Sequence, residues 1–499
     1  MSRHPDYLTA TDIYRFLQCP HWPYYERFAT DEEKRLKTPV TESQRLRQEN
    51  GYAHEREVVT KLFKEQPILE VPDVKDADRN FEATLEQMRN GAPLIYQGTL
   101  TNGDWTGLPD LLERHEGESK FGPWFYVPVD VKSSHALEKY QKLQLIFYAT
   151  LLERIQGRFP AEPAIINSDS ERISFQADAH IAEFEQVVTE LERIRAGEKP
   201  DPVLRKSCYD TGPWGVMCER YAKSLNDIAL LYNVDIHKLR SLRQLGVRSI
   251  DDAAEIDPSS LDGLAKGLRV HSLEVIKRQA QSLKTSAVII RKPVLLPNSG
   301  LEIHFDIESD PPNDVDYLYG ILMRLPEGDS YQAFVAEHLE DEEKMWRAFL
   351  AWIETLPAEY HVYHYAAYEP MRLGVLKKRY GGSQALDVFA TRLIDLKETV
   401  THAVVYPLYF YGLKYILPFL GFSWSGDIKS GGQSIDVFER YLETKDRAVL
   451  DSIIQYNEDD VRATAYLKDW MVTYAREMTS YAEPYPWKNT YVGHRQIGR

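Results

Sequence analysis

One strand near residue 300 constrains the fold of this chain more than any other segment. In LEIHFDIES, residues 301–309, apolar side chains alternate with His304, Asp306 and Glu308, so the two faces of a strand carry different chemistry. Acidic residues are poor strand formers, and two of them on one face therefore need a reason. A divalent metal ion shared by the two carboxylates supplies that reason. The segment predicts a strand with a metal site on one face.

Further carboxylates follow this strand in a regular order. YLYGILMRL and YQAFVAEH are the expected antiparallel partner strands, and the helix EEKMWRAFLAWIETL comes next. Glu369 stands where the strand in HVYHYAAYEPMRLG runs into a helix, and Tyr456 and Asp460 are four residues apart on one face of the helix IIQYNEDDVRATAYLKDW. The alternative, unrelated acids on polar surfaces, does not account for this order and spacing.

The combination of D-x-E, a carboxylate at a strand end and Y-x-x-x-D resembles the DEDD exonucleases, which have an RNase H-like (DnaQ-like) fold. The resemblance implies two Mg²⁺ or Mn²⁺ ions, 3′–5′ cleavage of nucleic-acid ends, and a tyrosine that orients the attacking water. Transferred to this sequence, the tyrosine is Tyr456 and the metal ligands are Asp306, Glu308, Glu369 and Asp460. The chain departs from the family at Glu369, where aspartate is usual. Asp395 and the segment YGLKYILPFLGF are expected to support the structure or the substrate.

A second group of candidate residues lies in the N-terminal half. PLIYQGTL, TGLPDLLERHE and WFYVPVDVKSS are expected strands, and LEKYQKLQLIFYATLLERIQG has the apolar spacing of a helix. Asp130 and Lys132 are two apart in a strand and point to one face, which Asp110 on the preceding strand can reach. Two carboxylates can hold a divalent metal ion, and a neighbouring lysine can orient the attacking water. An isolated D-x-K pair is more often a surface ion pair, but this one follows G-x-P-D and precedes Q-x-x-x-Y.

This joint pattern resembles the PD-(D/E)XK nucleases of the RecB type, which have a restriction-endonuclease-like fold. The resemblance implies that Asp110 and Asp130 bind one or two metal ions and that Lys132 is the catalytic lysine. It also implies that Gln144 and Tyr148 form the Q-x-x-x-Y element of the active site. His54, in NGYAHEREVV, corresponds to a further metal ligand of this subfamily.

Three cysteines are too few for a disulfide framework and suit a reducing cytoplasm. The segment TATDIYRFLQCPHWPYYERF resembles the start of RecB-type domains, where a cysteine joins a C-terminal cysteine cluster to hold a [4Fe–4S] cluster. The resemblance places Cys19, Cys208 and Cys218 at three of the four ligand positions and Thr211 at the fourth. Such clusters normally need four thiolates, so an iron–sulfur site and three ordinary buried cysteines both stay open.

The middle of the chain is nearly free of strand patterns. LRSLRQLGVRSIDDAAEI is expected to form two helices joined by a turn at Gly246, with Arg243 and Arg248 on either side. It resembles a helix-hairpin-helix motif, in which backbone N–H groups at a helix N-terminus meet a DNA phosphate. A helical hairpin that serves only for packing is the alternative.

These motifs predict a multi-domain α/β protein, because 499 residues exceed what one core organises. The expected parts are a RecB-like PD-(D/E)XK domain at 1–222, a small all-α helix-hairpin-helix domain at 223–290 and an RNase H-like exonuclease domain at 291–499. A net charge of −16 argues against general coating of duplex DNA, although metal ions at carboxylate sites restore attraction for phosphate. With no apolar run long enough for a bilayer and no signal peptide, a cytoplasmic protein without a membrane partner is expected.

Over nearly the whole chain, the pattern resembles RecB-like nucleases that combine a helix-hairpin-helix segment with an RNase H-like domain. Relatives of this kind occur fused to, or near, superfamily 1 helicases. The resemblance implies a nuclease with two active sites that acts on DNA, favours single-stranded ends and serves repair, recombination or defence. Two alternatives stay open: a DNA-docking subunit of a helicase complex with inactive sites, and an RNA-processing exonuclease whose RecB-like half only binds.

Overall fold

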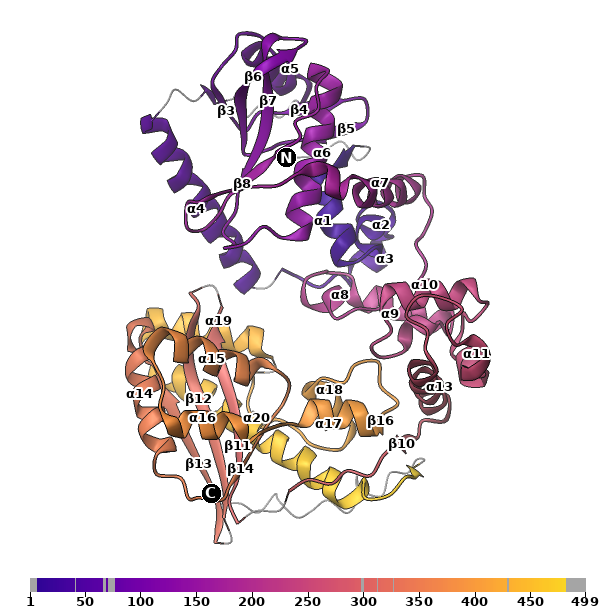
Figure 1. Cartoon of the computed structure of the whole chain (residues 1–499), viewed down its shortest axis with the longest axis vertical. Helices are drawn as coiled ribbons and strands as arrows, with labels where there is room; N and C mark the ends of the chain where they lie inside the picture. The colour runs from indigo at the N-terminus through magenta and orange to yellow at the C-terminus, as the bar shows by residue number, and fades with distance from the viewer. Residues whose placement is uncertain are drawn as a thin grey trace. The chain divides into compact units, whose positions relative to one another are not determined.

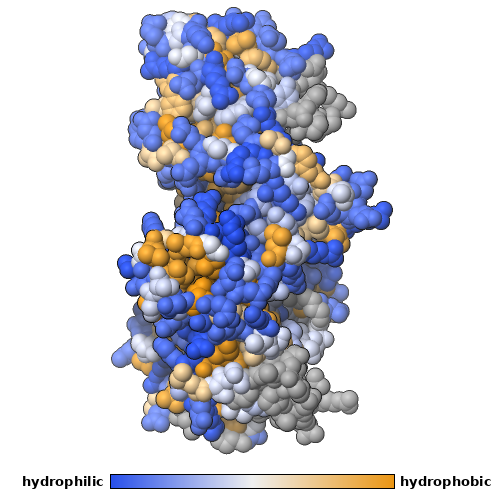
Figure 2. Space-filling view, turned by 90° about the vertical axis from the view of Figure 1, so that its right-hand side faces the viewer, coloured by the Kyte–Doolittle hydropathy of each residue, from blue (hydrophilic) through white to orange (hydrophobic). Residues whose placement is uncertain are grey.

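The structure is a computed structural model, and the residues that it describes are 7–40, 42–65, 69–70, 77–297, 300–311, 313–325, 327–428 and 430–481. The chain forms two compact units, Met1–Ala222 and Lys223–Arg499, and each mixes helices with strands (Figure 1). Among the described residues, no helix combines the length and the apolar character needed to cross a bilayer. Hydrophilic residues predominate on the face drawn in Figure 2, and hydrophobic residues form smaller separate areas there.

The first unit is built around a six-stranded sheet. Its strand order is β2 (Leu69–Glu70), β3 (Leu94–Tyr96), β6 (Leu111–Ser119), β7 (Gly122–Val131), β8 (Ala164–Ile166) and β9 (Arg172–Ser174). The long strands β6 and β7 are antiparallel, whereas β7 and β8 are parallel. A smaller sheet has the order β1 (Leu8–Thr9), β5 (Trp105–Gly107) and β4 (Leu100–Asn102).

Helices surround these two sheets. They are α1 (Ala10–Gln18), α2 (His21–Phe28), α3 (Asp31–Lys34), α4 (Glu42–Glu65), α5 (Ala77–Arg89), α6 (Lys139–Gln156), α7 (Ile181–Arg195), α8 (Ser207–Asp210) and α9 (Gly215–Ser224). Helix α6 contacts β7 and is the central helix of the unit, because Leu143, Ile146 and Phe147 are fully buried. It ends at Gly157, whose φ of 72° is the left-handed conformation that glycine adopts without strain.

Two of the strands expected in the N-terminal half are interrupted. The PLIYQGTL segment splits into β3 and β4 where Gln97 has a φ of 50°. The TGLPDLLERHE segment splits into β5 and β6 on either side of Pro109, which has no N–H to donate to a strand ladder. Asp110 therefore lies in a bend immediately before β6 and not within a strand.

The second unit contains a five-stranded mixed sheet. Its order is β13 (Gly328–Val335), β12 (Val315–Leu325), β11 (Glu302–Asp310), β14 (His361–His364) and β15 (Leu393–Asp395). Strands β11, β12 and β13 form an antiparallel meander, and β14 runs parallel to β11. The strand predicted at 301–309 and its two predicted partners are confirmed.

The two faces of β11 are covered by different helices, as its alternating sequence requires. Ile303, Phe305 and Ile307 join a core with residues of α14 (Glu342–Ile353), α15 (Tyr368–Tyr380) and α16 (Gln384–Thr391). The 28-residue helix α20 (Arg447–Tyr474), which begins at the capping side chain of Asp446, contacts β11 and β12 from the opposite face. The other helices of this part are α17 (Leu396–Ala403), α18 (Leu413–Phe419) and α19 (Gly431–Thr444).

The helical middle segment is tied to the C-terminal region within this unit. It contains α10 (Ile236–Gln244), α11 (Ile250–Glu255), α12 (Pro258–Leu261) and α13 (Val270–Thr285). Strand β10 (Val288–Ile290) follows and pairs with both β16 (Val404–Val405) and β17 (Ser480–Tyr481). The segment that follows β10 is also anchored, because Arg291 N–H donates to Ala403 O (2.7 Å) and Val294 N–H donates to Ala475 O (2.7 Å).

Helix α20 approaches β12 closely at Gly320. A Cβ atom at Gly320 would lie 1.5 Å from the Oδ1 atom of Asn457, so only glycine fits beneath this helix. The amide of Asn457 in turn donates to Asp306 Oδ2 (2.8 Å) and accepts from the Tyr331 hydroxyl (2.9 Å). The register of α20 over the sheet thus depends on glycine at position 320, which has no side chain to displace Asn457.

Replacing Gly320 by Ala should displace Asn457 and destabilise the protein by about 1–3 kcal/mol, as overpacking of a close contact does. Urea unfolding followed by circular dichroism measures the loss. Gly374→Ala is the matched control, because a Cβ atom there meets nothing within 4 Å inside α15. This control should gain roughly 0.5–1 kcal/mol from helix propensity. An equal free energy of unfolding in the two variants would contradict the proposed role of Gly320.

Candidate active site

Three carboxylates meet where α20 crosses β11. Asp306 and Glu308 lie on one face of β11, and Asp460 reaches the same place from α20. One carboxylate oxygen from each of the three lies within 4.8 Å of the other two. Glu308 and Asp460 are buried and Asp306 is half-buried, so water screens their mutual repulsion poorly.

The protonation of this group reflects that repulsion. Burial, followed by the charges of Glu308, Asp460 and Glu369, raises the pKa of Asp306 well above its usual value. Burial and the charge of Asp460 raise the pKa of Glu308 to about 8, although a hydrogen bond from Ser434 opposes the shift. Three carboxylates that cannot all be ionised in the protein alone form a donor set that suits a divalent cation. The residues present therefore fit a metal ion.

Glu369 lies near this group without joining its close contacts. It occupies the first turn of α15, is buried, and lies 3.2 Å from the Nδ1 atom of His364. Burial raises the pKa of Glu369, whereas the hydrogen bond with His364 lowers it. Asp395 Oδ1 accepts from the backbone N–H of Ala366 (2.9 Å) and so positions the loop before Glu369. In the described part of the chain, the close group has three carboxylates and not the four expected.

Tyr456 lies one helical turn before Asp460 and is buried beside it. Burial and the charges of Asp460, Glu308 and Asp306 raise the pKa of Tyr456 far above its ordinary value. The phenol therefore stays protonated. Burial raises the pKa of Asp460, and Lys414, Trp424 and the Tyr456 hydroxyl oppose that shift. Tyr456 is thus a hydrogen-bond donor at the edge of the carboxylate group.

Lys414 is a site residue that the sequence did not reveal. It lies in α18 and forms an ion pair with Asp460. Its ammonium group lies 3.9 Å from the ring centroid of Trp424 and 4.3 Å from that of Tyr456. The Trp424 indole N–H donates to Asp460 Oδ1 at 2.5 Å. The one available signal was the lysine inside the otherwise apolar segment YGLKYILPFLGF.

The neighbouring acid Asp459 has a different role from Asp460. Its carboxylate accepts from the Ser425 backbone N–H (2.7 Å) and from the Ser425 hydroxyl (2.8 Å). Asp459 therefore fixes the loop that carries Trp424, while the next residue along α20, Asp460, belongs to the carboxylate group. Asn457, which binds Asp306, was also missed, because nothing local in the sequence marks an asparagine that reaches another strand.

The N-terminal unit brings Asp110, Asp130 and Lys132 together. Asp130 Oδ1 accepts from the Asp110 N–H (3.3 Å), and Asp110 Oδ2 accepts from the Val131 N–H (2.7 Å). The Lys132 ammonium lies 2.9 Å from Asp130 Oδ2 and 3.9 Å from Asp110 Oδ2. Although Asp110 lies in a bend, these backbone contacts direct both carboxylates to one place at the end of β7.

Electrostatics in this unit point to a third carboxylate. Burial, and then the charge of Asp130, raise the pKa of Asp110 to about 8, while Lys132 opposes the shift and Glu55 adds to it. Glu55 is buried in α4 and accepts from the Tyr96 hydroxyl (3.0 Å) and the Gln97 amide (3.2 Å). The sequence pattern predicted a role for its neighbour His54, and Glu55 carried no local sign of this contact.

The remaining residues expected at this site have structural contacts. The His54 Nε2–H donates to Asn167 O (3.1 Å), and His54 forms no close three-ligand group with the two aspartates in the described residues. The Gln144 amide donates to Ala10 O (3.0 Å) and ties α6 to the start of α1. Tyr148 is buried against Gly107, where a Cβ atom would lie 2.7 Å from the tyrosine ring. Gln144 thus fixes α6 to α1, and Tyr148 fixes it against β5.

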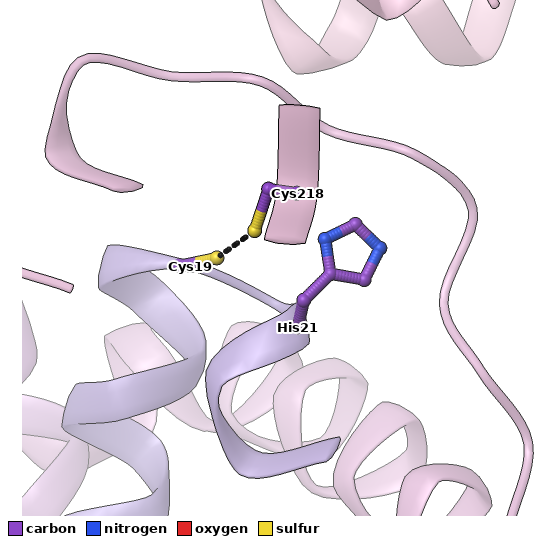
Figure 3. Close-up of side chains that lie close together, drawn as sticks. All are labelled: Cys19, His21 and Cys218. Carbon is purple, nitrogen blue, oxygen red and sulfur yellow. Dashed lines mark hydrogen bonds between the residues drawn. The ribbon is translucent and has the colours of Figure 1, made fainter. Parts of the chain in front are cut away.

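The three cysteines of this unit lie together, Cys19 at the end of α1 and the other two in α8 and α9. All are buried and free, and the Cys19 and Cys218 sulfurs are 3.3 Å apart. Cys208 packs in the same buried cluster, and its thiol lies 3.8 Å from Val203 O. His21 lies beside Cys19 and Cys218, with one ligand atom from each within 4.8 Å of the others (Figure 3).

The helical hairpin between α10 and α11 has internal partners for most of its polar groups. Gly246 has a φ of 85°, and its N–H donates to Arg243 O (3.1 Å). The Arg243 guanidinium, which was expected to face DNA, is buried and pairs with Asp227 at 2.7 Å. The N–H groups of Arg248 and Ser249 donate to Asp252. The three residues expected to contact DNA were Arg243, Gly246 and Arg248. Of these, Arg248 alone has an exposed, positively charged side chain.

Comparison with known proteins identifies one part of the chain. A family model described as RNase_H superfamily matches residues 303–472, which extend from β11 into α20 and include the whole carboxylate group. No curated protein matches the chain at a significant level. RNase H-like domains are generally nucleases that bind nucleic acid and use divalent metal ions. The C-terminal part of this chain is accordingly supported as an RNase H-like domain of nuclease type.

Proposed function

We propose that this protein is a metal-dependent nuclease that hydrolyses phosphodiester bonds, and that its C-terminal unit is a 3′–5′ exonuclease of the DEDD type. The observation that carries the proposal is the convergence of Asp306, Glu308 and Asp460 within 4.8 Å in a largely buried setting. Carboxylates so placed repel one another unless a cation lies between them. The match of this region to the RNase_H superfamily agrees with that chemistry.

Each residue of the C-terminal site has a distinct role in this proposal. The three close carboxylates would hold Mg²⁺ or Mn²⁺, and Glu369, whose charge acts on Asp306, would contribute to a second ion. Divalent ions at such a site supply a hydroxide nucleophile near neutral pH and stabilise the leaving oxygen. The protonated Tyr456 can donate a hydrogen bond to the attacking water, and Lys414 brings a positive charge that can meet a phosphate oxygen.

We propose a second nuclease site at Asp110, Asp130 and Lys132. The two aspartates would hold one or two metal ions with Glu55 as a further carboxylate, and Lys132 would orient the attacking water. Support comes from the 2.9 Å contact of Lys132 with Asp130 and from the raised pKa of Asp110. The RecB-type resemblance suggests DNA as the substrate of this site. It also suggests a helicase partner and a role in repair, recombination or defence.

The two sites should act independently, because they share no residue and lie in different units. Asp306→Ala should lower the exonuclease rate by at least about 100-fold, since one metal-binding carboxylate is lost, and leave cleavage at the N-terminal site unchanged. Asp130→Ala should have the opposite effect. The assay uses Mg²⁺ or Mn²⁺ with end-labelled single- and double-stranded DNA and RNA.

Glu354→Gln, an exposed substitution outside both sites, is the control and should cleave like the unchanged protein. Loss of all cleavage of every substrate in either single variant would refute the two-site proposal. Wild-type rates on every substrate in the Asp306→Ala variant would refute the C-terminal site itself.

Relief of carboxylate repulsion should stabilise the metal-free protein. Asp306→Asn keeps an acceptor for Asn457 and removes one charge, so with chelator present it should raise stability by about 1–3 kcal/mol. Raised carboxyl pKa values mean that the unfolded chain ionises first, so stability falls as pH rises from about 4 through about 8. The advantage of the variant should therefore be small at pH 5 and large at pH 8.5.

Thermal unfolding at the two pH values, with and without Mn²⁺, measures this effect. The metal should raise the melting temperature at pH 8.5 more in the unchanged protein than in Asp306→Asn, which keeps only the N-terminal carboxylate site intact. Asp387→Asn, which removes an exposed carboxylate that pairs with Lys377, controls for the change in net charge. A variant that is less stable than the unchanged protein at pH 8.5 without metal would contradict the argument.

We propose that Arg248 is the phosphate contact of the hairpin, since it is exposed, whereas Arg243 is structural. Arg248→Ala should weaken nucleic-acid binding across sequences and reduce the salt slope by about 1. Arg243→Ala should instead destabilise the unit by roughly 3–5 kcal/mol, because it leaves Asp227 buried without its charge partner. Fluorescence anisotropy at several salt concentrations and thermal unfolding separate the two effects. Unchanged affinity in Arg248→Ala would leave the hairpin a packing element.

A further inference from the structure

The cluster of Cys19, Cys208, Cys218 and His21 has a composition that the nuclease chemistry does not use. The four residues come from distant parts of the N-terminal unit: Cys19 follows α1, His21 begins α2, and the other cysteines lie in α8 and α9. Each is buried, with a relative exposure of 1% for Cys19 and 0% for the other three. Buried thiols and an imidazole in mutual contact are the donor set of a soft or borderline metal ion.

The [4Fe–4S] cluster implied by the RecB-type resemblance does not fit this donor set. Only three thiolates are present, because Thr211 occupies the fourth position. In such a cluster each thiolate binds a different iron atom, so the cysteine sulfurs stand apart around it. Here the Cys19 and Cys218 sulfurs are 3.3 Å apart, which leaves no room for a cuboidal cluster between them.

A single tetrahedral ion fits the same distance far better. Zinc–sulfur bonds of about 2.3 Å at tetrahedral angles place two thiolates about 3.8 Å apart, close to the separation seen here. Cys208 packs in the same buried cluster and would add a third sulfur, although in the described residues it lies outside the close group of Cys19, His21 and Cys218. A fourth ligand is then required to close the coordination sphere.

The orientation of His21 makes it that ligand. Its Nε2 atom lies 3.2 Å from Pro200 O, and a carbonyl oxygen can only accept, so Nε2 carries the proton. The neutral ring therefore has its lone pair on Nδ1. Figure 3 shows the ring with one nitrogen toward the Cys19 and Cys218 sulfurs and the other on the far side. A backbone carbonyl that fixes the tautomer is the usual outer partner of a metal-binding histidine.

We propose that Cys19, Cys208, Cys218 and His21 bind one Zn²⁺ ion in a closed, structural Cys₃His site. Four protein ligands leave no position for water, so the ion has no catalytic role. It holds the α1–α2 junction, near the start of the unit, against α8 and α9, near its end. The site thus fastens the two ends of the N-terminal unit together, and the energy of metal binding contributes to the stability of its fold.

Metal analysis of the full chain tests this proposal. Protein produced in medium containing both zinc and iron, and purified without oxygen, should hold about one zinc ion per chain and no acid-labile sulfide. Zinc should remain after a mild chelator has removed Mg²⁺ or Mn²⁺ from the carboxylate sites. Replacement by Co²⁺ should give the intense visible bands of a tetrahedral thiolate site.

Variants at His21 distinguish a ligand from a packing residue. His21→Ala should release zinc to a competing chelator on the order of 100-fold more readily, and its cobalt spectrum should change. His21→Cys should retain zinc, because Cys₄ is an equally good tetrahedral set. His271→Ala, an exposed histidine in the other unit, is the control and should behave like the unchanged protein.

Three results would overturn the proposal. Iron with stoichiometric sulfide in place of zinc would show a cluster, and a Cys19–Cys218 disulfide in metal-free protein would show a redox pair. Zinc retention by His21→Ala equal to that of the unchanged protein would show that the histidine is not a ligand. Because His21→Cys preserves a ligand, its zinc content remains informative even if the alanine variant fails to fold.

Discussion

The close approach of α20 to the sheet at Gly320 is the contact on which the candidate active site depends. The absence of a side chain at Gly320 lets Asn457 lie against β12, and from there its amide binds Asp306. Asp460 lies one helical turn further along and is brought to the carboxylates of β11 by the same register. A shift of α20 by even one residue would rotate Asp460 by about 100° around the helix axis and away from them.

Bringing these carboxylates together in a buried setting causes electrostatic repulsion, and the surrounding residues reduce that repulsion. Burial raises the pKa of Asp306 and Glu308, whereas Lys414 opposes the shift at both. The aromatic rings of Trp424 and Tyr456 lie beside the Lys414 ammonium and hold that charge close to Asp460. In the N-terminal site, the positive charge of Lys132 likewise lies close to both aspartates. In both units a lysine partly compensates a donor set that a divalent cation would compensate fully.

Much of the C-terminal fold could be predicted from local patterns. The alternation of Ile303, Phe305 and Ile307 with polar residues fixed the face of β11 that meets the core. Interruptions were harder to foresee: Asp110 lies in a bend after Pro109, although the sequence around it reads as one continuous strand. Arg243 was also misjudged. The sequence predicted an exposed contact to DNA, but the side chain is buried against Asp227, and a helical sequence does not distinguish these two environments.

By itself, the sequence determined the elements of the C-terminal sheet and suggested the two sets of acidic residues, because strand and helix periodicity is a local property that spacing reveals. Only the tertiary structure decided which partners complete each set. Three of these partners are far in sequence from the carboxylates that they meet: Lys414, Asn457 and Glu55. His21 is close to Cys19 in the chain, but nothing in the local sequence shows that it also meets Cys218. Their contacts arise from packing between elements, and packing depends on side-chain volume and register across the whole unit, which no short segment encodes.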